Sequence, residues 1–231
     1  VGTHRGGKII AAPVAKLLPL SKADSKPVAK PAGKPLVPTE FKSEAGATGV
    51  ISGDGTILVS GKNGKDTYRL TATVPAGPPV TAIRIEVLPD ETLPLRGPGR
   101  AANGNFVLSE FSVEVLPTAA QKKETPVVFN TVTADHSQAG WPVASAIDGK
   151  QNTGWGIAGA IGKSHSAVFT MKEAPVIKAG TVLAFVLSQQ FTDGRHSIGK
   201  FRLVVEQEVQ DVASEKSSRE ALGKDSKKSR Q

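Results

Sequence analysis

The residues that first suggest chemistry are oxygen donors gathered in one short segment. Asp148 is followed by Gly149 and then by Asn152 and Thr153, so a carboxylate, an amide and a hydroxyl fall within a single tight loop. Ca²⁺ binds about six to eight oxygen ligands of such kinds. The segment therefore predicts a structural calcium site. An alternative needs no ion: Asp148 makes an Asx turn and Thr153 caps it.

A second group of polar side chains surrounds a turn that is rich in Gly and Pro. Planar guanidinium and amide groups offer paired hydrogen bonds in fixed geometry, which suits the hydroxyls of a polyol. The predicted ligand-binding residues here are Arg96, Arg100, Asn103 and Asn105. Arg100 has a structural alternative, because an arginine after Gly97-Pro98-Gly99 can anchor the loop on backbone carbonyls or on Glu110.

Aromatic and imidazole side chains complete the predicted ligand-binding set. Trp141 and Trp155 are the two tryptophans of the chain, and an exposed indole can stack on the apolar face of a sugar. Trp155, between two glycines, fits a core position better, whereas the polar surroundings of Trp141 leave both interpretations open. His165 and His196 belong to the set as well. Neither has the spacing of a metal site, so a hydrogen-bonding role within the fold is their alternative.

The residue types exclude several reactions. The chain has no cysteine, which removes disulfides, thiolate-held zinc, iron–sulfur clusters and thiol nucleophiles. No serine lies in a Gly-x-Ser-x-Gly elbow, and the Gly97-Pro98-Gly99 run lacks the Gly-Lys-Ser/Thr of a phosphate loop. A glycoside hydrolase needs two carboxylates facing one cleft, and Asp90, Glu91 and Glu110 are the candidates for them. We predict that the protein is not an enzyme.

The candidate residues need a rigid frame, and the sequence predicts one made of short strands. Apolar and polar residues alternate from Tyr68 to Val74, as in a strand with one buried and one wet face. The predicted strands are 56–60, 68–74, 83–87, 111–115, 127–134, 166–171, 182–189 and 201–206. They predict an all-β fold, an antiparallel jelly-roll β-sandwich. Two long loops, 88–105 and 134–165, hold most of the candidate residues, and loops of such length are usually functional.

Composition divides the chain into three parts. Residues 1–35 carry seven Lys or Arg against one acid and many Pro and Ala, and residues 209–231 are rich in Ser, Lys and Glu. Both segments bury too little apolar surface to fold, so we predict disordered linkers around a sandwich domain at 36–208. The basic segment lacks the aromatic residues of base stacking, and no apolar run is long enough to cross a bilayer. Neither nucleic acid nor membrane insertion is predicted.

The predicted domain resembles a module of large planctomycete proteins, where it accompanies cytochrome c-like domains. The resemblance covers about 41–205 and is carried by residues 81–90, 97–100, 103–110, 146–149, 154–155, 165–169 and 196–203. The stretch from Ala146 to Trp155 also resembles the first loop of discoidin-type domains, which share the galactose-binding-like jelly roll. The chain departs from the pattern at Phe41, where Trp is expected, and at Lys200, where Arg is usual.

The resemblance implies a binding module that does no chemistry. In related sugar-binding modules an acid near the end of the domain completes a structural calcium site, which implies Glu206 as a partner of Asp148, Asn152 and Thr153. A periplasmic or extracellular location is implied too, although Val1–Arg5 lack the apolar core of a signal peptide. The expected function is carbohydrate binding, with a polysaccharide or glycan as partner. The alternative is an internal docking domain that holds neighbouring cytochrome-like or catalytic domains and binds no free ligand.

Overall fold

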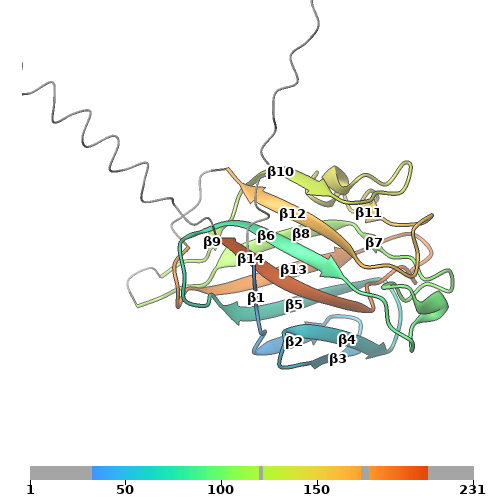
Figure 1. Cartoon of the computed structure of the whole chain (residues 1–231), viewed down its shortest axis with the longest axis horizontal. Helices are drawn as coiled ribbons and strands as arrows, with labels where there is room; N and C mark the ends of the chain where they lie inside the picture. Colours follow the sequence, from blue (N-terminus) through green and yellow to red (C-terminus); the bar gives the residue numbers. More distant parts are fainter. Residues whose placement is uncertain (1–32, 120–121, 173–176, 208–231) are drawn as a thin grey trace, which may run out of the picture. The chain divides into compact units, whose positions relative to one another are not determined.

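The computed structural model describes residues 33–119, 122–172 and 177–207, which form a β-sandwich of antiparallel sheets (Figure 1). The first sheet contains, in order, β10 (Phe129–Ala134), β12 (His165–Met171), β6 (Val80–Val87), β14 (Lys200–Gln207), β4 (Thr56–Gly61) and β3 (Ala47–Ile51), with β1 (Lys34–Pro35) beside β14. The second contains β2 (Glu40–Ser43), β5 (Asp66–Thr73), β13 (Val182–Gln189), β8 (Glu110–Val115) and β9 (Thr125–Pro126). This confirms the predicted all-β sandwich.

Strands from the two halves of the sequence are mixed within both sheets. In the first sheet β14, the last strand, lies between β6 and β4, and its residue Phe201 pairs with Val87. In the second sheet β13 lies between β5 and β8. Because hydrogen-bond ladders join the halves, the described residues build one sandwich rather than two. Within the described residues no helix is long and apolar enough to span a bilayer.

The core follows the predicted alternation along most strands. In β5 the side chains of Tyr68, Leu70 and Ala72 are buried between the sheets, whereas Arg69 points to solvent. Strand β6 differs, because Arg84 on its outer face is also buried. Ion pairs explain the difference: Arg84 pairs with Glu206 of β14 and, at 3.0 Å, with Glu86. In a central strand, the charged side chains of the neighbouring strands cover the outer face.

The predicted strand 127–134 is broken in the structure. Strand β9 ends at Pro126 in the second sheet, and β10 begins at Phe129 in the first. Between them Val127 N donates to Val113 O at 2.8 Å, and Lys172 N donates to Val128 O at 2.9 Å. Residues 127–128 therefore carry the chain from one sheet to the other, a crossing that alternation of residue types does not reveal.

The boundary of the predicted N-terminal linker is wrong by a few residues. Lys34 and Pro35 form β1 and pair with Val205 and Val204 of β14. Leu36 is 1% exposed, and its amide donates to Leu203 O at 2.9 Å. One apolar residue beside a basic, Pro-rich segment gave too weak a pattern to predict a strand. The rest of that predicted linker, and the predicted linker 209–231, lie outside the described residues.

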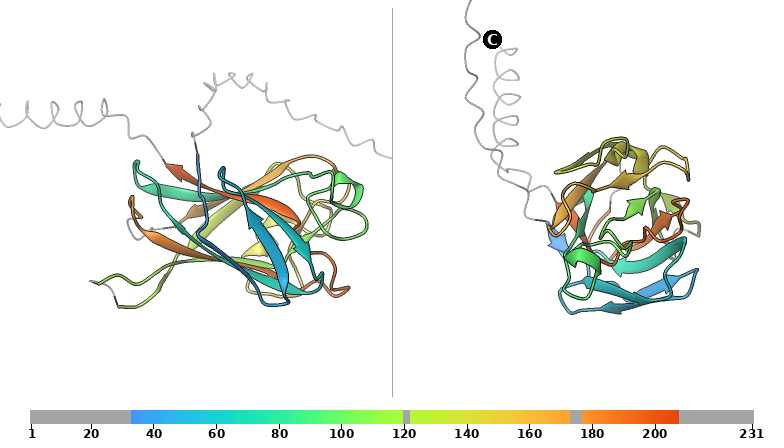
Figure 2. Two further views of the ribbon diagram at one scale, coloured as in Figure 1. Left: turned by 90° about the horizontal axis from the view of Figure 1, so that it is seen from below. Right: turned by 90° about the vertical axis from the view of Figure 1, so that its right-hand side faces the viewer.

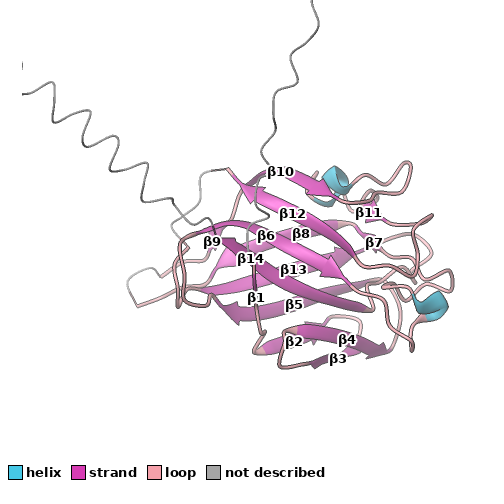
Figure 3. Cartoon of the chain, in the orientation of Figure 1, coloured by secondary structure: helices cyan, strands magenta, loops and turns pink. Residues whose placement is uncertain are grey.

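Five connections gather at one end of the sandwich, which we call the loop end: 44–46, 62–65, 88–109, 135–164 and 190–199. They contain the ribbon of β7 (Val107–Leu108) and β11 (Trp155–Gly156), and the 3-10 helices η1 (Pro94–Arg96) and η2 (Val143–Ala146). Figure 3 shows both helices on the right, at this end, and the right-hand view of Figure 2 faces it. Both predicted long loops lie here.

Leu36 and Val37 provide a test of the domain boundary. Leu36→Ala empties a core position and should lower the free energy of unfolding by about 2–5 kcal/mol. Val37→Ala is the matched control, because Val37 is 48% exposed and should change it by less than about 0.5 kcal/mol. Urea unfolding of the full chain measures both. Equal, small effects would show that the segment is no part of the fold.

Candidate functional site

The loop end is held together by hydrogen bonds between its connections. Strand β7 pairs with β11, joining connection 88–109 to 135–164. On its other side, connection 88–109 bonds to 190–199: Arg100 N donates to Ser197 O at 2.8 Å, and Val107 N donates to His196 O at 2.9 Å. The first long loop is therefore clamped from both sides, and the loop end is a rigid surface.

Asn105 joins the two long loops through its side chain. It is 3% exposed; its Nδ2 donates to Gln138 Oε1 at 3.0 Å and its Oδ1 accepts from Ile157 N at 2.9 Å. Both ends of the amide are therefore used inside the protein. The structure thus places this predicted ligand-binding residue in the framework instead.

Trp155 and His165 are also framework residues. Trp155 is fully buried, its Nε1 donates to His136 O at 2.9 Å, and its ring meets Phe106 edge to face. Trp155 therefore occupies a core position, the interpretation that the sequence favoured for it. His165 is 6% exposed, and its two ring nitrogens lie 2.9 Å from Asp135 Oδ2 and 2.8 Å from Ala160 O. The polar atoms of both side chains are therefore used within the protein.

The two predicted arginines have different environments. Arg100 takes the structural alternative: its Nη1 and Nη2 donate to Lys62 O at 2.9 Å and Gly61 O at 2.6 Å. Arg96 is exposed and pairs with Glu91 at 2.9 Å. Its backbone lies in the left-handed region at φ 54, as does that of Leu95 at φ 50, a costly conformation for residues other than glycine.

Asn103 and the Asp148 segment are stabilised locally. Asn103 Oδ1 accepts from the Asn105 amide at 3.1 Å. Thr153 Oγ1 donates to both Asp148 oxygens, at 2.9 and 3.0 Å, and Lys150 N donates to Asp148 Oδ1 at 2.9 Å. Burial raises the pKa of Asp148, but the hydrogen bonds from Thr153 and Lys150 outweigh it, so the pKa lies below its ordinary value. These are the bonds of the ion-free alternative.

Glu206 cannot complete a site with Asp148. It lies near the far end of β14, pairs with Arg84 and is remote from the loop end, where Asp148 lies beside Glu110 of β8. Within the described ranges, no three His, Asp or Glu side chains are arranged to hold a metal ion. The predicted role of Glu206 is therefore wrong, and calcium binding by the other three residues stays a prediction.

A polar groove lies on the outer face of the second sheet, where β5 begins and β13 ends. Its volume is ≈ 570 Å³, and it is lined by Lys65, Thr67, Gln151, Asn152, Ser188, Gln190 and Thr192. Thr67 and Ser188 are cross-strand partners and are each 8% exposed, so they form the floor. Ser188 Oγ donates to Gln151 Oε1 at 2.7 Å, which fixes loop 135–164 over the groove. Of these residues, Asn152 was predicted from the sequence as a functional residue, namely a calcium ligand.

An aromatic row runs beside this groove. The Phe191 ring meets Trp141 at 5.1 Å and His196 at 4.6 Å, in both cases edge to face, and all three side chains are partly exposed. His196 Nδ1 lies 2.8 Å from Asp193 Oδ1. The groove and the row share segment 190–192, because Phe191 stands between two groove residues. Segment 190–192 directly follows β13 and lies outside the two predicted long loops, so loop length gave no signal for it.

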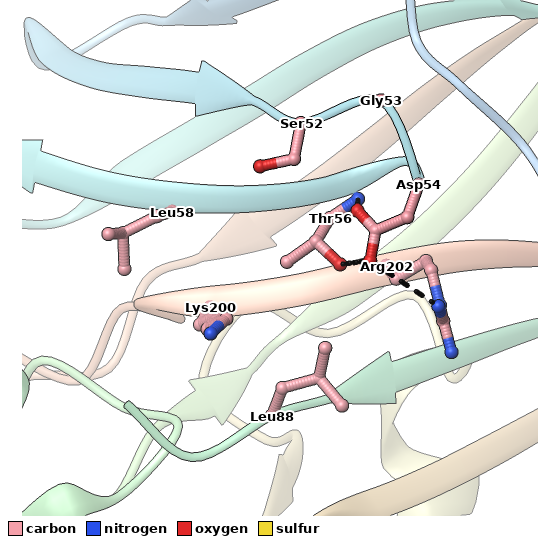
Figure 4. Close-up of a pocket in the computed structure, with 8 residues that line it drawn as sticks. All are labelled: Ser52, Gly53, Asp54, Thr56, Leu58, Leu88, Lys200 and Arg202. Carbon is pink, nitrogen blue, oxygen red and sulfur yellow. Dashed lines mark hydrogen bonds and ion pairs between the residues drawn. The ribbon is translucent and has the colours of Figure 1, made fainter. Parts of the chain in front are cut away.

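A second pocket of ≈ 570 Å³ lies on the outer face of the first sheet (Figure 4). Its charged side chains already have partners: Lys200 lies 2.9 Å from Asp90, and Arg202 lies 2.6 Å from Glu86. Asp54, drawn pointing toward Arg202, also accepts from the Thr56 amide and hydroxyl, which lowers its pKa. Because these charges are paired within the protein, a charged ligand would gain little here.

Two of the three carboxylates considered for a hydrolase, Asp90 and Glu91, line one pocket of ≈ 380 Å³. Asp90 accepts from Thr92 Oγ1 at 2.6 Å and from Lys200, which lowers its pKa to about 2. Glu91 is exposed and paired with Arg96. Glu110 lies in the second sheet, where burial raises its pKa. Glu110 is not among the residues that line this pocket, and Asp90 and Glu91 are each paired with a cation. That the protein is not an enzyme stays a prediction.

Comparison with known proteins found no match: no family model, curated protein or solved structure corresponds to this chain. The resemblance to discoidin-like modules thus stays a prediction. What the fold and the site define is a β-sandwich with a rigid loop end, which presents a polar groove and an aromatic row.

Asn105 tests whether the loop end is a rigid unit. Asn105→Ala removes two hydrogen bonds and leaves the buried Ile157 amide without its acceptor, whereas Gln138 Oε1 still accepts from Ala158 N. It should destabilise the protein by about 2–3 kcal/mol. Asn152→Ala, at an exposed position, is the matched control and should change stability by less than about 0.5 kcal/mol. Chemical denaturation measures both. A neutral Asn105→Ala would contradict the proposed clamp.

Asp90 gives a test that depends on pH. Its pKa in the folded protein, about 2, lies below the unfolded value of about 3.9. Its ionised form therefore stabilises the fold above about pH 4, and this contribution is lost as pH falls toward 2. Asp90→Asn should cost about 1 kcal/mol at pH 6 and less at pH 3, as measured by urea unfolding. Glu91→Gln, in an exposed pair, should be nearly neutral at both pH values.

Proposed function

We propose that the protein is a non-catalytic carbohydrate-binding module whose binding surface is the groove together with the aromatic row. The observation that carries this proposal is their junction at segment 190–192. Gln190 and Thr192 line the groove, while Phe191 supports the partly exposed Trp141. A ligand that meets both surfaces must combine many hydroxyls with an apolar face, and sugars have both.

The chemistry of the lining supports a ligand of this class. Six of the seven groove residues carry amides or hydroxyls, and Lys65 is the exception. Amides and hydroxyls both donate and accept, as the hydroxyls of a sugar do. The volume of ≈ 570 Å³ lies within the usual range for ligand sites, about 300–1,000 Å³. No carboxylate lines the groove, which fits binding without hydrolysis.

Preorganisation supplies the mechanism. The groove residues come from strands β5 and β13, from connections 62–65 and 190–199, and from loop 135–164. The buried Asn105 and Trp155 hold that loop in place. A surface that is ordered before the ligand arrives loses less entropy on binding. Of the residues predicted to bind a ligand, Trp141 and His196 belong to this proposed surface. Asn152, predicted as a calcium ligand, also lines the groove.

Trp141 tests this proposal directly. In affinity electrophoresis against a panel of neutral and acidic polysaccharides, Trp141→Ala should weaken retention by about 2–10-fold, because stacking contributes about 0.5–1.5 kcal/mol. Trp141→Phe keeps an aromatic face and should retain most of the binding. If the unaltered protein binds no polysaccharide of the panel, the proposal is wrong, and the internal docking domain becomes the better account.

A further inference from the structure

The buried His165 has two acceptors and needs two protons to bond to both. Asp135 Oδ2 lies 2.9 Å from Nδ1, and Ala160 O lies 2.8 Å from Nε2. A backbone carbonyl only accepts, and so does an ionised carboxylate. A neutral imidazole has a single N–H, whereas the imidazolium has two. The contacts seen in the structure are therefore complete only when His165 is protonated.

Asp135 is held in its ionised form by the same cluster. Burial raises its pKa, but hydrogen bonds from the Ser166 amide, at 2.7 Å, and from His165 outweigh burial and leave the pKa below its ordinary value. The other charged or titratable groups nearby are His136, whose ring centre lies 5.3 Å from that of His165, and Lys163 on the same loop. In β6, the strand partner of His165 is the apolar Val87.

The cluster fastens both ends of loop 135–164. Asp135 directly follows β10, and His165 is the first residue of β12. Ala160, which His165 also contacts, belongs to the returning part of the loop. This loop carries Trp141 of the aromatic row together with Gln151 and Asn152 of the groove. The His165 cluster and both parts of the proposed binding surface therefore belong to one loop.

We infer that protonated His165 is a positioning residue, which fastens the returning part of loop 135–164 at Ala160 and frees it on losing a proton. The neutral ring can keep one N–H on the Asp135 carboxylate but then loses the bond to Ala160 O, so the residues around Ala160 open more readily as pH rises. The effect on binding rests on the proposed function. The effect on the loop does not, and it can be measured without a ligand.

Hydrogen exchange of the full chain tests the inference. After correction for the intrinsic pH dependence of exchange, amides in 158–164, around Ala160, should lose about tenfold in protection between pH 5.5 and pH 8.5, as expected for the loss of one charge-assisted hydrogen bond. His165→Gln should remove this dependence. His196→Gln is the matched control, since it alters another imidazole paired with an aspartate, and it should leave the dependence in place.

Two results would overturn the inference: equal protection of the unaltered chain at both pH values, or a pH dependence that persists in His165→Gln. If His165→Gln does not fold, the ¹⁵N shifts of the His165 ring in the unaltered protein decide instead. They should report two protonated nitrogens at pH 5.5 and one at pH 8.5, and a neutral ring at pH 5.5 would contradict the proposal. Loop opening at high pH without polysaccharide binding at either pH would refute the proposed function alone.

Discussion

Peptide groups that leave water need hydrogen-bond partners, and this requirement shapes the loop end. Three connections, 88–109, 135–164 and 190–199, cross that end and are buried at Asn105, Trp155 and Ile198. They satisfy their amides and carbonyls on one another, through the β7–β11 ribbon and an isolated bridge between Gly99 and Ile198. A Cβ at Gly99 would lie 1.9 Å from Asn105 O, so only glycine allows this approach. Irregular segments become a rigid surface because their backbones pair with each other.

The same requirement decides which side chains remain for a ligand. Asn105, Trp155 and Arg100 are the groups best suited to bind a sugar by type, and each of them bonds to the framework. The exposed surface lies beside them, where the outer face of the second sheet meets segment 190–192. Buried groups hold the loops in place, and partly exposed groups are available to a ligand, so the two sets differ even where they are neighbours in sequence.

The outer face of the first sheet shows a different use of charge. Arg84, Glu86 and Arg202 on adjacent strands neutralise one another, and Arg84 and Glu206 are almost fully buried. Buried ion pairs of this kind contribute little net stability, because desolvation offsets much of their attraction. Breaking one member of such a pair is nevertheless costly. The ion pairs between β6 and β14 therefore favour these two strands as neighbours. They also explain why the polar pocket on this face contains charges that are already paired.

The sequence by itself determined the fold class and most of the strands, because alternation of apolar and polar residues directly reflects the two faces of a strand. It also placed the long loops, and it favoured a core position for Trp155 between its glycines. Only the tertiary structure decided that Leu36 belongs to the core, that Glu206 lies far from Asp148, and that Phe191 joins a groove to an aromatic row. These facts depend on which strands become neighbours in the sheets. That pairing brings together residues far apart in the chain, and local patterns carry no information about it.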